Sequence, residues 1–441
     1  MTSLSDRVRG ALSAFRSPTV PSAAPPDEPG DVPEMLGVIG AALLSSAQAT
    51  SDVEDTLRRV AARYDNPHIR VFVLPTLVLV EDAGVTPPQT SIFPAVKETL
   101  RLDQAGEVDH TVRRALADRP GPRHVIDEIQ HATTLPPRFG WVLGILGYLL
   151  LTMGFGLVLN PTASALPIYL VLGLVVGTIV KIGARFPTLS LILPVATAFT
   201  VTLLVAKLAS PLVHDDVLRL VAPSFVSFLP GLTLTVAAVE LTAGQVMAGA
   251  SRMVFGFARL GLLAFGVYAG LSVAGASAPV DGHPDTLGAW APWAGIALVA
   301  IGFYLYSTAP RRSLIWILYA LIVAYSAQLL GSLLVGAELS GLVGALIVVP
   351  AVRLVGQLRS APPPAVMLTC AYWLLVPGSM GFIGLSEAAA GSAGATDTIL
   401  QTLGSLLAIA IGMMLGAGLS KDAVAMVRGW KAHPLTGADR V

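Results

Sequence analysis

The chain has 441 residues, of which 54% are hydrophobic and only 13% are charged, and its formal net charge at pH 7 is zero. Soluble domains cannot bury that much apolar surface, which excludes an ordinary soluble protein and predicts that most of the chain faces lipid. The single cysteine, Cys370, excludes an intramolecular disulfide and a cysteine-based metal site.

The N-terminal residues 1–33 are rich in Pro, Ser and Ala, as in SPTVPSAAPPDEPGD, and show no sustained apolar periodicity. This composition predicts a disordered tail. The tail lacks the continuous apolar core of a signal peptide, so we expect the N-terminus to stay in the cytoplasm.

Residues 34–137 are predicted to form a small cytoplasmic α+β domain. Helical apolar spacing follows Glu34, and Ser51 with Glu54 fits a capping box, which favours two helices in series. The segment IRVFVLPTLVLVED predicts a strand or bent strand pair around Pro75, and TSIFPAVK predicts a further short strand. The segments EVDHTVRRALAD and PRHVIDEIQHA predict two short amphipathic helices.

Ten apolar stretches follow, each near the roughly 20 residues that cross about 30 Å of hydrocarbon. They are Trp141–Leu159, Leu166–Gly183, Leu189–Ala209, Val217–Val239, Val254–Gly275, Leu287–Thr308, Leu314–Val335, Ser340–Val355, Ala365–Leu385 and Thr398–Leu419. The predicted fold class is therefore an all-α polytopic membrane protein with about ten transmembrane helices, preceded by the α+β domain.

Basic residues concentrate in alternate connections between these stretches. They are Lys181 and Arg185, Arg252 and Arg259, Arg311 and Arg312, Arg353 and Arg359, and Lys421, Arg428 and Lys431. By the positive-inside rule, both termini and the tail 426–441 are predicted to be cytoplasmic in a multi-pass cell membrane protein. The third connection, with Lys207 and Arg219, is an exception.

Two stretches share the pattern P-G-x8-E-x3-G. FLPGLTLTVAAVELTAG runs from Phe228 to Gly244, and LVPGSMGFIGLSEAAAG runs from Leu375 to Gly391. Residues 138–285 and 286–425 would each hold five spans, and an odd number makes the second half enter the membrane from the opposite face. The chain is thus predicted to be a 5+5 inverted repeat, as in many secondary transporters, with both Pro-Gly breaks near the midplane.

A Pro-Gly break frees backbone groups that lipid cannot satisfy, whereas a solute or a water-filled cavity can. A solute carboxylate would suit the N-terminus of a half helix, and an ammonium would suit freed carbonyl groups. The predicted substrate pathway comprises Pro230, Gly231, Thr233, Thr235, Pro377, Gly378 and Ser379. The alternative is that the two Pro-Gly pairs are kinks that only shape helix packing. Breaks at corresponding positions in the two halves of the chain favour a solute site instead.

Glu240 and Glu387 each lie ten residues past their proline, about 15 Å along a helix, and so near opposite membrane faces. They are either solvated acids at helix ends or groups for gating or proton coupling. Snorkelling to the interface explains Arg252, whereas Arg259, deeper in its apolar run, is the better candidate partner of Glu240 or of a substrate carboxylate.

No catalytic, cofactor-binding or metal site is predicted. His110, His124 and His131 match no metal-site signature and the soluble domain offers no reaction centre, so an enzyme is not expected. No Walker A sequence is present, so ATP-driven transport by this chain alone is not expected. The expected partners are a small-molecule solute, protons and the lipid bilayer. No nucleic acid is expected, and assembly into a homo-oligomer is left open.

The chain resembles the threonine/serine exporter family in four of its segments. These are LLSSAQATSDVEDTLRRVAARYD, the strand with Pro75-Thr76, and the LPGLTLT...ELTAG and LVPGSMGF elements. LLSSA and ARYD depart from the usual pattern, where glycines would be more common. The resemblance implies a secondary transporter that exports threonine and serine from the cytoplasm, driven by the proton gradient. Relatives of similar architecture are linked to dicarboxylate export, which is the first alternative. A membrane-anchored enzyme or sensor acting through the soluble domain is the second.

Overall fold

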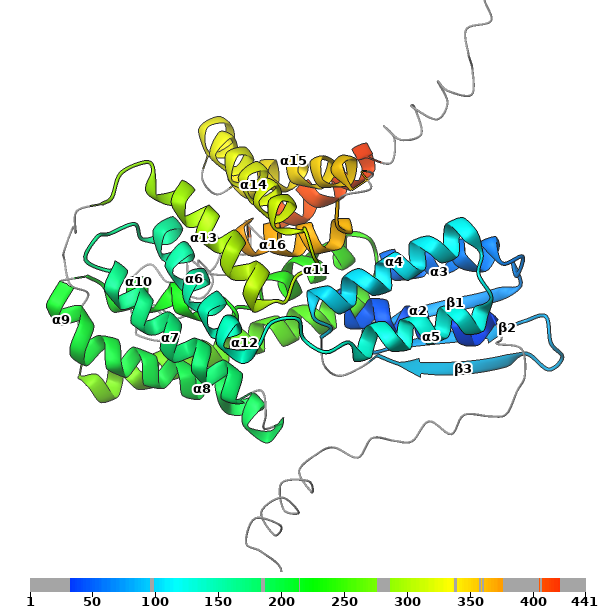
Figure 1. Cartoon of the computed structure of the whole chain (residues 1–441), viewed down its shortest axis with the longest axis horizontal. Helices are drawn as coiled ribbons and strands as arrows, with labels where there is room; N and C mark the ends of the chain where they lie inside the picture. Colours follow the sequence, from blue (N-terminus) through cyan, green and yellow to red (C-terminus); the bar gives the residue numbers. More distant parts are fainter. Residues whose placement is uncertain are drawn as a thin grey trace, which may run out of the picture.

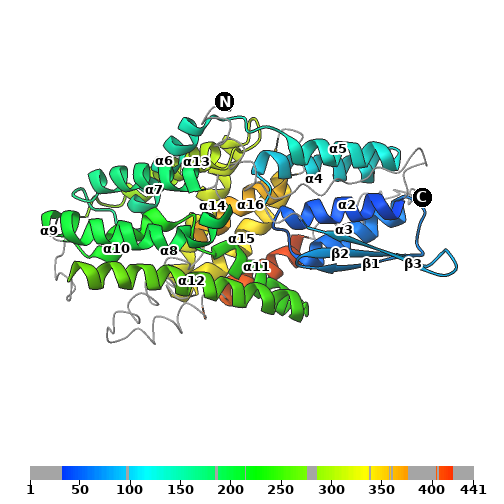
Figure 2. The same cartoon turned by 90° about the horizontal axis from the view of Figure 1, so that it is seen from below.

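The computed structural model describes residues 32–95, 99–183, 187–213, 215–275, 286–336, 339–356, 358, 361–375, 404 and 407–420. They form two parts that lie side by side along the long axis (Figures 1 and 2). An N-terminal domain holds all the described strands, and a helical part follows it, from Trp141 onward.

The N-terminal domain packs four helices against a three-stranded sheet. Its elements are α2 (Val32–Ser45), α3 (Thr50–Arg63), β1 (Ile69–Leu74), β2 (Leu77–Asp82), β3 (Gln89–Pro94), α4 (Leu102–Asp118) and α5 (Pro122–Thr134). The sheet is antiparallel in the order β1-β2-β3, with Leu74 paired to Leu77 across the turn at Pro75. Alternate residues of β1 are buried, so one face of the sheet joins the helices in a shared core. The predicted strand pair around Pro75, the further strand and the amphipathic helices are confirmed.

The start of α3 differs from the prediction. The predicted helix after the first is present, but it begins at Thr50 with Ala49 as its N-cap, and no side chain of its own segment caps it. Ser51 therefore lies inside the first turn, and Glu54 forms an ion pair with Arg58 one turn later. The predicted capping box is wrong, and the first turn of α3 has to be satisfied from elsewhere.

The helical part consists of apolar helices of unequal length. They are α6 (Trp141–Leu159), α7 (Leu166–Gly183), α8 (Pro187–Leu204), a π-helical turn (Val205–Ala209), α9 (Ser210–Val213), α10 (Val217–Val221), a 3-10 turn (Ala222–Phe225), α11 (Gly231–Thr242), α12 (Val246–Ala274), α13 (Ala291–Tyr306), α14 (Leu314–Val335), α15 (Ser340–Val355), α16 (Pro364–Leu375) and a last helix, Leu407–Ser420. The bounds of α6, α7, α14 and α15 coincide with the predicted ones.

Five of the described helical segments are long and apolar enough to cross a membrane. These are Trp141–Leu159, Leu166–Gly183, Ile192–Ala209, Val246–Ala274 and Leu314–Val335. The chain is a membrane protein that is mostly helical and carries a small sheet. Ten spans and the 5+5 repeat stay predictions, because the other described apolar helices are shorter.

The predicted fourth span is interrupted. After α10 and the 3-10 turn, α11 begins at Gly231 with Pro230 as its N-cap, so the chain breaks where the Pro-Gly pair predicts. Proline lacks an amide donor and cannot continue the preceding hydrogen-bond ladder. The matching residues Pro377, Gly378, Ser379 and Glu387 lie outside the described residues.

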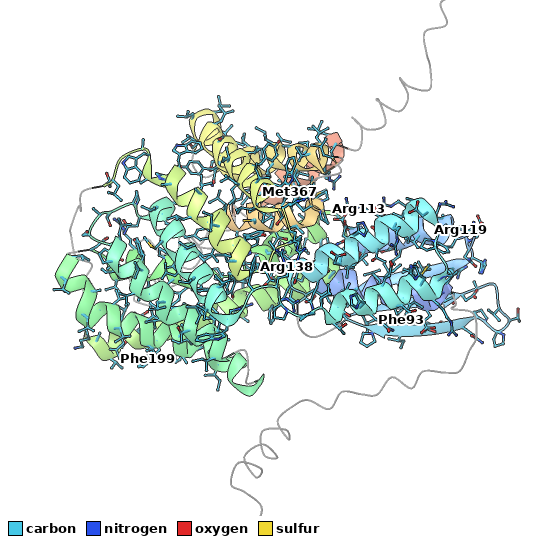
Figure 3. The ribbon with its side chains drawn as sticks, in the orientation of Figure 1. Phe93, Arg113, Arg119, Arg138, Phe199 and Met367 are labelled. Atoms are coloured by element: carbon cyan, nitrogen blue, oxygen red, sulfur yellow. The ribbon has the colours of Figure 1, made fainter. Side chains whose placement is uncertain are left out.

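Glycines bring α6 and α13 into close contact. A Cβ added at Gly154 would lie 2.7 Å from the carbonyl oxygen of Gly295, and one added at Gly302 would lie 2.7 Å from that of Gly147. The two backbones therefore approach where no side chain separates them, as is usual between helices in lipid. The sticks in Figure 3 show side chains filling the rest of the interior, including Met367 of α16, which is fully buried.

Candidate functional site

Glu240, near the end of α11, is fully buried and reaches the N-terminal domain. Its Oε1 accepts hydrogen bonds from the backbone N–H of Thr50 at 2.8 Å and from the Thr50 hydroxyl at 3.0 Å. Thr50 is the first residue of α3, so a carboxylate 190 residues away in the chain caps this helix. An acidic group at a helix N-terminus satisfies an unpaired amide and interacts favourably with the helix dipole.

Arg252 completes this joint. Its Nε lies 3.1 Å from Oε2 of Glu240, an ion pair that lacks the alignment of a hydrogen bond. Its Nη2 donates to the backbone carbonyl of Gln48 at 3.3 Å, in the connection before α3. We call Thr50, Gln48, Glu240 and Arg252 the α3 joint. It couples the N-terminal domain to the hairpin of α11 and α12 through one buried ion pair.

The prediction that Arg259 is the partner of Glu240 is wrong, and so is the account of Arg252 as a snorkelling residue only. Helices α11 and α12 pack as a hairpin in which Gly249 faces Ala237 and Gly256 faces Leu234. Arg252 is therefore level with the end of α11, whereas Arg259 lies seven residues, about 10 Å, further along α12. There Arg259 is within electrostatic reach of Tyr306.

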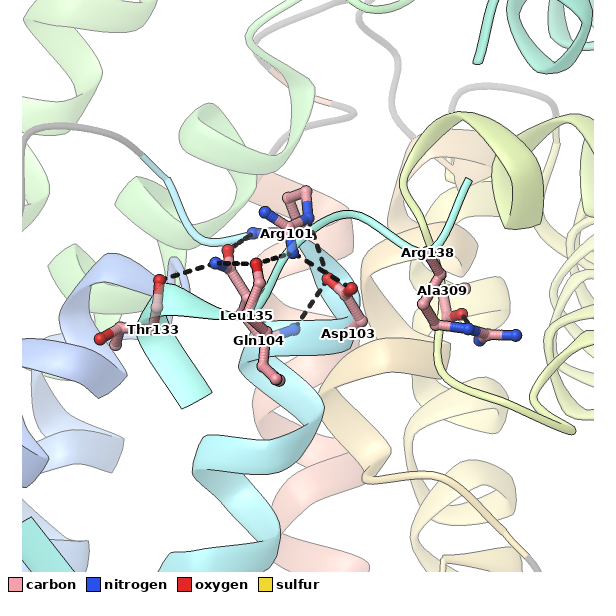
Figure 4. A network of polar contacts seen from close by, with 7 residues as sticks. All are labelled: Arg101, Asp103, Gln104, Thr133, Leu135, Arg138 and Ala309. Atoms are coloured by element: carbon pink, nitrogen blue, oxygen red, sulfur yellow. Dashed lines mark hydrogen bonds and ion pairs between the residues drawn. The ribbon is translucent and has the colours of Figure 1, made fainter. Parts of the chain in front are cut away.

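A second contact joins the two parts at the base of α4 (Figure 4). Arg101 donates to the carbonyl of Leu135 at 2.7 Å and pairs with Asp103, which ties the start of α4 to the end of α5. Beside it, Arg138 donates to the carbonyl of Ala309 at 2.7 Å, in the connection between α13 and α14. Arg138 lies between the two parts in Figure 3 as well.

A cavity of about 770 Å³ lies between the N-terminal domain and the helical part. Residues from the α2–α3 connection, α3 and α4 form one wall, and residues from α11, α15, α16 and the last helix form the other. The lining residues are Ser46, Ala47, Gln48, Ala49, Asp52, Asp55, Thr56, Arg58, Arg59, Asp109, Leu232, Val236, Val239, Arg353, Pro364, Leu368, Thr369, Tyr372 and Met413. Its size is within the range of small-molecule sites.

The α11 side of this cavity begins directly after the break. Leu232, the second residue of α11, lines the cavity together with Val236 and Val239. Within the described residues, α16 also packs on α11, so the helix after one Pro-Gly pair lies beside the helix before the other. On the N-terminal wall, burial raises the pKa of the Asp109 carboxyl, and the nearby Arg113 acts in the opposite direction.

The predicted pathway residues on α11 are partly placed. Thr235 is fully buried, and its hydroxyl has no hydrogen-bond partner among the described residues. Thr233 is partly buried. Pro230 and Gly231 form the start of α11, where no side chain caps the helix. An uncapped helix start next to an orphaned hydroxyl is a place where a polar ligand gains hydrogen bonds.

Upstream of the break, Tyr148 of α6 fixes the irregular segment. Its hydroxyl donates to the carbonyl of Ser224 at 2.6 Å and lies 2.9 Å from the Ser227 hydroxyl. The Tyr148 ring also packs edge-on against Tyr306, and Lys181 lies over the Tyr306 ring. These contacts hold the 3-10 turn and the residues after it, where the α-helical hydrogen-bond ladder is interrupted.

Tyr148→Phe is expected to lower the thermal unfolding midpoint of the purified chain in detergent. The change removes the hydroxyl that donates to the buried carbonyl of Ser224, a loss of about 1–3 kcal/mol. Tyr268→Phe is the matched control because Tyr268 is 45% exposed. Equal midpoints for both variants would contradict the role assigned to Tyr148.

Sequence reasoning missed the residues that act between the two parts. Gln48 and Thr50 lie inside the stretch that resembles the exporter family, but nothing local assigns them a contact, and Asp52, Arg353 and Tyr372 come together only in the folded chain. The sequence shows that Arg252 is basic, but the neighbouring residues in the chain do not distinguish an arginine that pairs with a buried acid from one that faces water.

A family model described as "Putative threonine/serine exporter" matches residues 34–274. The match spans the N-terminal domain, the α3 joint and the helices up to α12, and it covers more than half of the chain. The comparison with curated proteins gives no match, and neither does the comparison with solved structures.

Proposed function

Since the chain belongs to the threonine/serine exporter family, we propose that it is a secondary transporter that exports threonine and serine from the cytoplasm. We further propose that it is a multi-pass protein of the cell membrane with both termini cytoplasmic, and that the proton gradient drives export. The alternation of basic connections supports this orientation.

One observation carries the proposed pathway. The cavity between the two parts is lined by α11 and α16, the helices adjoining the two Pro-Gly pairs of the repeated pattern. In this proposal the cavity is the cytoplasmic entrance, and the solute passes from it to the break at Pro230. Discontinuous helices in corresponding positions of two halves are the usual solute site of such transporters.

At the break, the uncapped start of α11 would receive the solute carboxylate. The backbone N–H groups of Gly231 and the following residues point along the helix axis away from α11, and the positive end of the helix dipole favours an anion there. The buried hydroxyl of Thr235 would gain a partner in the solute. Pro377, Gly378 and Ser379 are proposed to supply the matching half of this site.

Glu240 is proposed as a gating residue. Its carboxylate holds the first turn of α3, and Asp52, which lines the cavity, lies on that same helix. Loss of the joint would therefore move the N-terminal wall of the cavity. Glu387 is proposed to act at the opposite mouth, and Arg259, which is partly buried near Tyr306, to act in the interior.

Dicarboxylate export is less well supported by the lining of the cavity. Three acidic and three basic side chains line it, so their formal charges cancel. A dianion would meet as much repulsion as attraction there, whereas an amino acid, which is itself neutral overall, suits a balanced lining.

The proposal is tested by efflux of labelled threonine, serine and succinate from proteoliposomes, with and without an imposed proton gradient. We expect threonine and serine efflux to depend on the gradient and to exceed that of succinate. Pro230→Ala, which lets the helix close across the break, is expected to slow efflux at least about tenfold.

Pro194→Ala is the matched control, because Pro194 lies inside α8 and away from the cavity. This variant is expected to transport like the unmodified chain. Undiminished efflux by Pro230→Ala would overturn the broken-helix pathway, and gradient-driven efflux of succinate alone would overturn the proposed substrate.

A further inference from the structure

The cavity between the two parts carries its charges on opposing walls. On the wall from the helical part, the ionisable lining residues are Arg353 of α15 and Tyr372 of α16. On the wall from the N-terminal domain, acidic residues lie on α3 and α4, namely Asp52, Asp55 and Asp109. A ligand that bridges the walls would meet a cation on one side and carboxylates on the other.

The last helix holds the side chain of Arg353 in place. Its Nη1 donates to the hydroxyl of Ser420 at 3.0 Å and to the carbonyl of Ala417 at 3.4 Å, both on the last helix. In the described part of the chain these two oxygen atoms are its hydrogen-bond partners, and both are neutral. The guanidinium has five donors, so an anchored Arg353 retains donors for a carboxylate.

The two basic lining residues of α3 are engaged on their own helix. Arg58 forms an ion pair with Glu54, and Arg59 donates to the hydroxyl of Thr56 at 3.0 Å. Asp109 pairs with Arg113 at 2.9 Å. Asp52 and Asp55 of α3 are the other acidic residues of this wall. A carboxylate has about four acceptor positions, so partners inside the protein still leave room for an ammonium.

Tyr372 connects the two sets of charges. It lines the cavity, is buried apart from 9% of its surface, and is within electrostatic reach of both Asp52 and Arg353. Tyr372 therefore lies near both the acid of one wall and the cation of the other. Thr369, one turn before Tyr372, adds a hydroxyl to the same lining.

We propose that this cavity is a recognition site for a small α-amino acid in its zwitterionic form, with Asp52 binding the ammonium and Arg353 binding the carboxylate. This inference rests on the proposed function and gives the N-terminal domain a part in substrate selection. Neither part of the protein can form the site alone, because each contributes one of the two charges. Solutes with only one charge lose one of the two contacts.

The test is equilibrium binding to the full chain in lipid nanodiscs, without a gradient. The probes are L-threonine, its methyl ester, which lacks the carboxylate, and 3-hydroxybutyrate, which lacks the ammonium. Asp52→Asn is expected to weaken binding of threonine and the ester about tenfold or more and to spare 3-hydroxybutyrate. Arg353→Gln is expected to weaken binding of threonine and 3-hydroxybutyrate by a similar factor and to spare the ester.

Asp118→Asn and Arg311→Gln are the matched controls, because both residues are exposed and neither lines the cavity. They are expected to bind threonine like the unmodified chain. Variants of Asp52 and Arg353 that weaken all three probes equally would show a structural role and overturn the proposal. Unchanged threonine binding in both variants, or analogues that bind the unmodified chain as tightly as threonine, would also overturn it.

The same measurements separate this inference from the proposed function. Probe-selective binding without gradient-driven efflux would overturn export and leave the recognition site standing. Efflux of threonine with unaltered binding in both variants would overturn the recognition site and leave export standing.

Discussion

Glu240→Ala is expected to release the first turn of α3 from the helical part. The change removes both acceptor contacts to Thr50 and leaves the guanidinium of Arg252 without its carboxylate, although its side chain is only 16% exposed. Removing one partner of a buried ion pair costs about 3–5 kcal/mol. Hydrogen exchange of the α3 backbone amides in the full chain measures this, and exchange in the first turn is expected to rise at least about a hundredfold.

Two further variants separate the charge from the contact. Glu240→Gln keeps an oxygen that accepts from the Thr50 amide but loses the ion pair, so its exchange is expected to lie between that of the alanine variant and the unmodified chain. Glu54→Ala on the same helix removes only a surface pair with Arg58, worth about 0.3–0.5 kcal/mol, and serves as the control. Unchanged exchange in Glu240→Ala would show that the joint does not hold the domain.

Gly302→Ala is expected to prevent α6 and α13 from packing. The added methyl group would lie 2.5 Å from the amide nitrogen of Leu151 and 2.7 Å from the carbonyl oxygen of Gly147. Both are backbone atoms, so no side chain can turn aside and the two helices must separate. Overpacking costs about 1–3 kcal/mol or more, and in lipid the lost backbone contact is the main attraction between the helices. Thermal unfolding of the purified chain should show a clear drop in midpoint.

Gly261→Ala is the control for this prediction. Gly261 lies inside α12, and a Cβ there would meet nothing within 4 Å. Alanine favours a helix by about 1 kcal/mol over glycine, so this variant is expected to be as stable as the unmodified chain or more stable. A Gly302→Ala protein with the same midpoint as Gly261→Ala would contradict the close packing of α6 on α13.

The α3 joint and the cavity form one arrangement. Thr50, which Glu240 caps, and Asp52, which lines the cavity, lie in the same turn of α3. Any event that weakens the joint would therefore also change the position of the acidic wall relative to Arg353. In the proposed export cycle, this links the position of the N-terminal domain to the affinity for the amino acid.

The local features of this protein could be predicted from its sequence. The bounds of α6, α7, α14 and α15 follow from uninterrupted apolar runs, since a helix in lipid satisfies all its own backbone groups. The hairpin of β1 and β2 follows from the alternating residues on either side of Pro75. The restart of the chain at Gly231 follows from the missing amide of Pro230. Each of these features depends on neighbours in the chain.

Contacts between distant segments were decided by the tertiary structure. The sequence placed Glu240 at a helix end but assigned it the wrong arginine, because Arg252 and Arg259 share a helix face and only the packing of α11 on α12 selects between them. It also predicted a local cap for α3, whereas the cap comes from Glu240. The opposing charges of Asp52 and Arg353 belong to two separate parts. Such pairs depend on how separate helices and domains pack together. The periodicity of a single helix shows which face is apolar but does not show which residue of another element that face will contact.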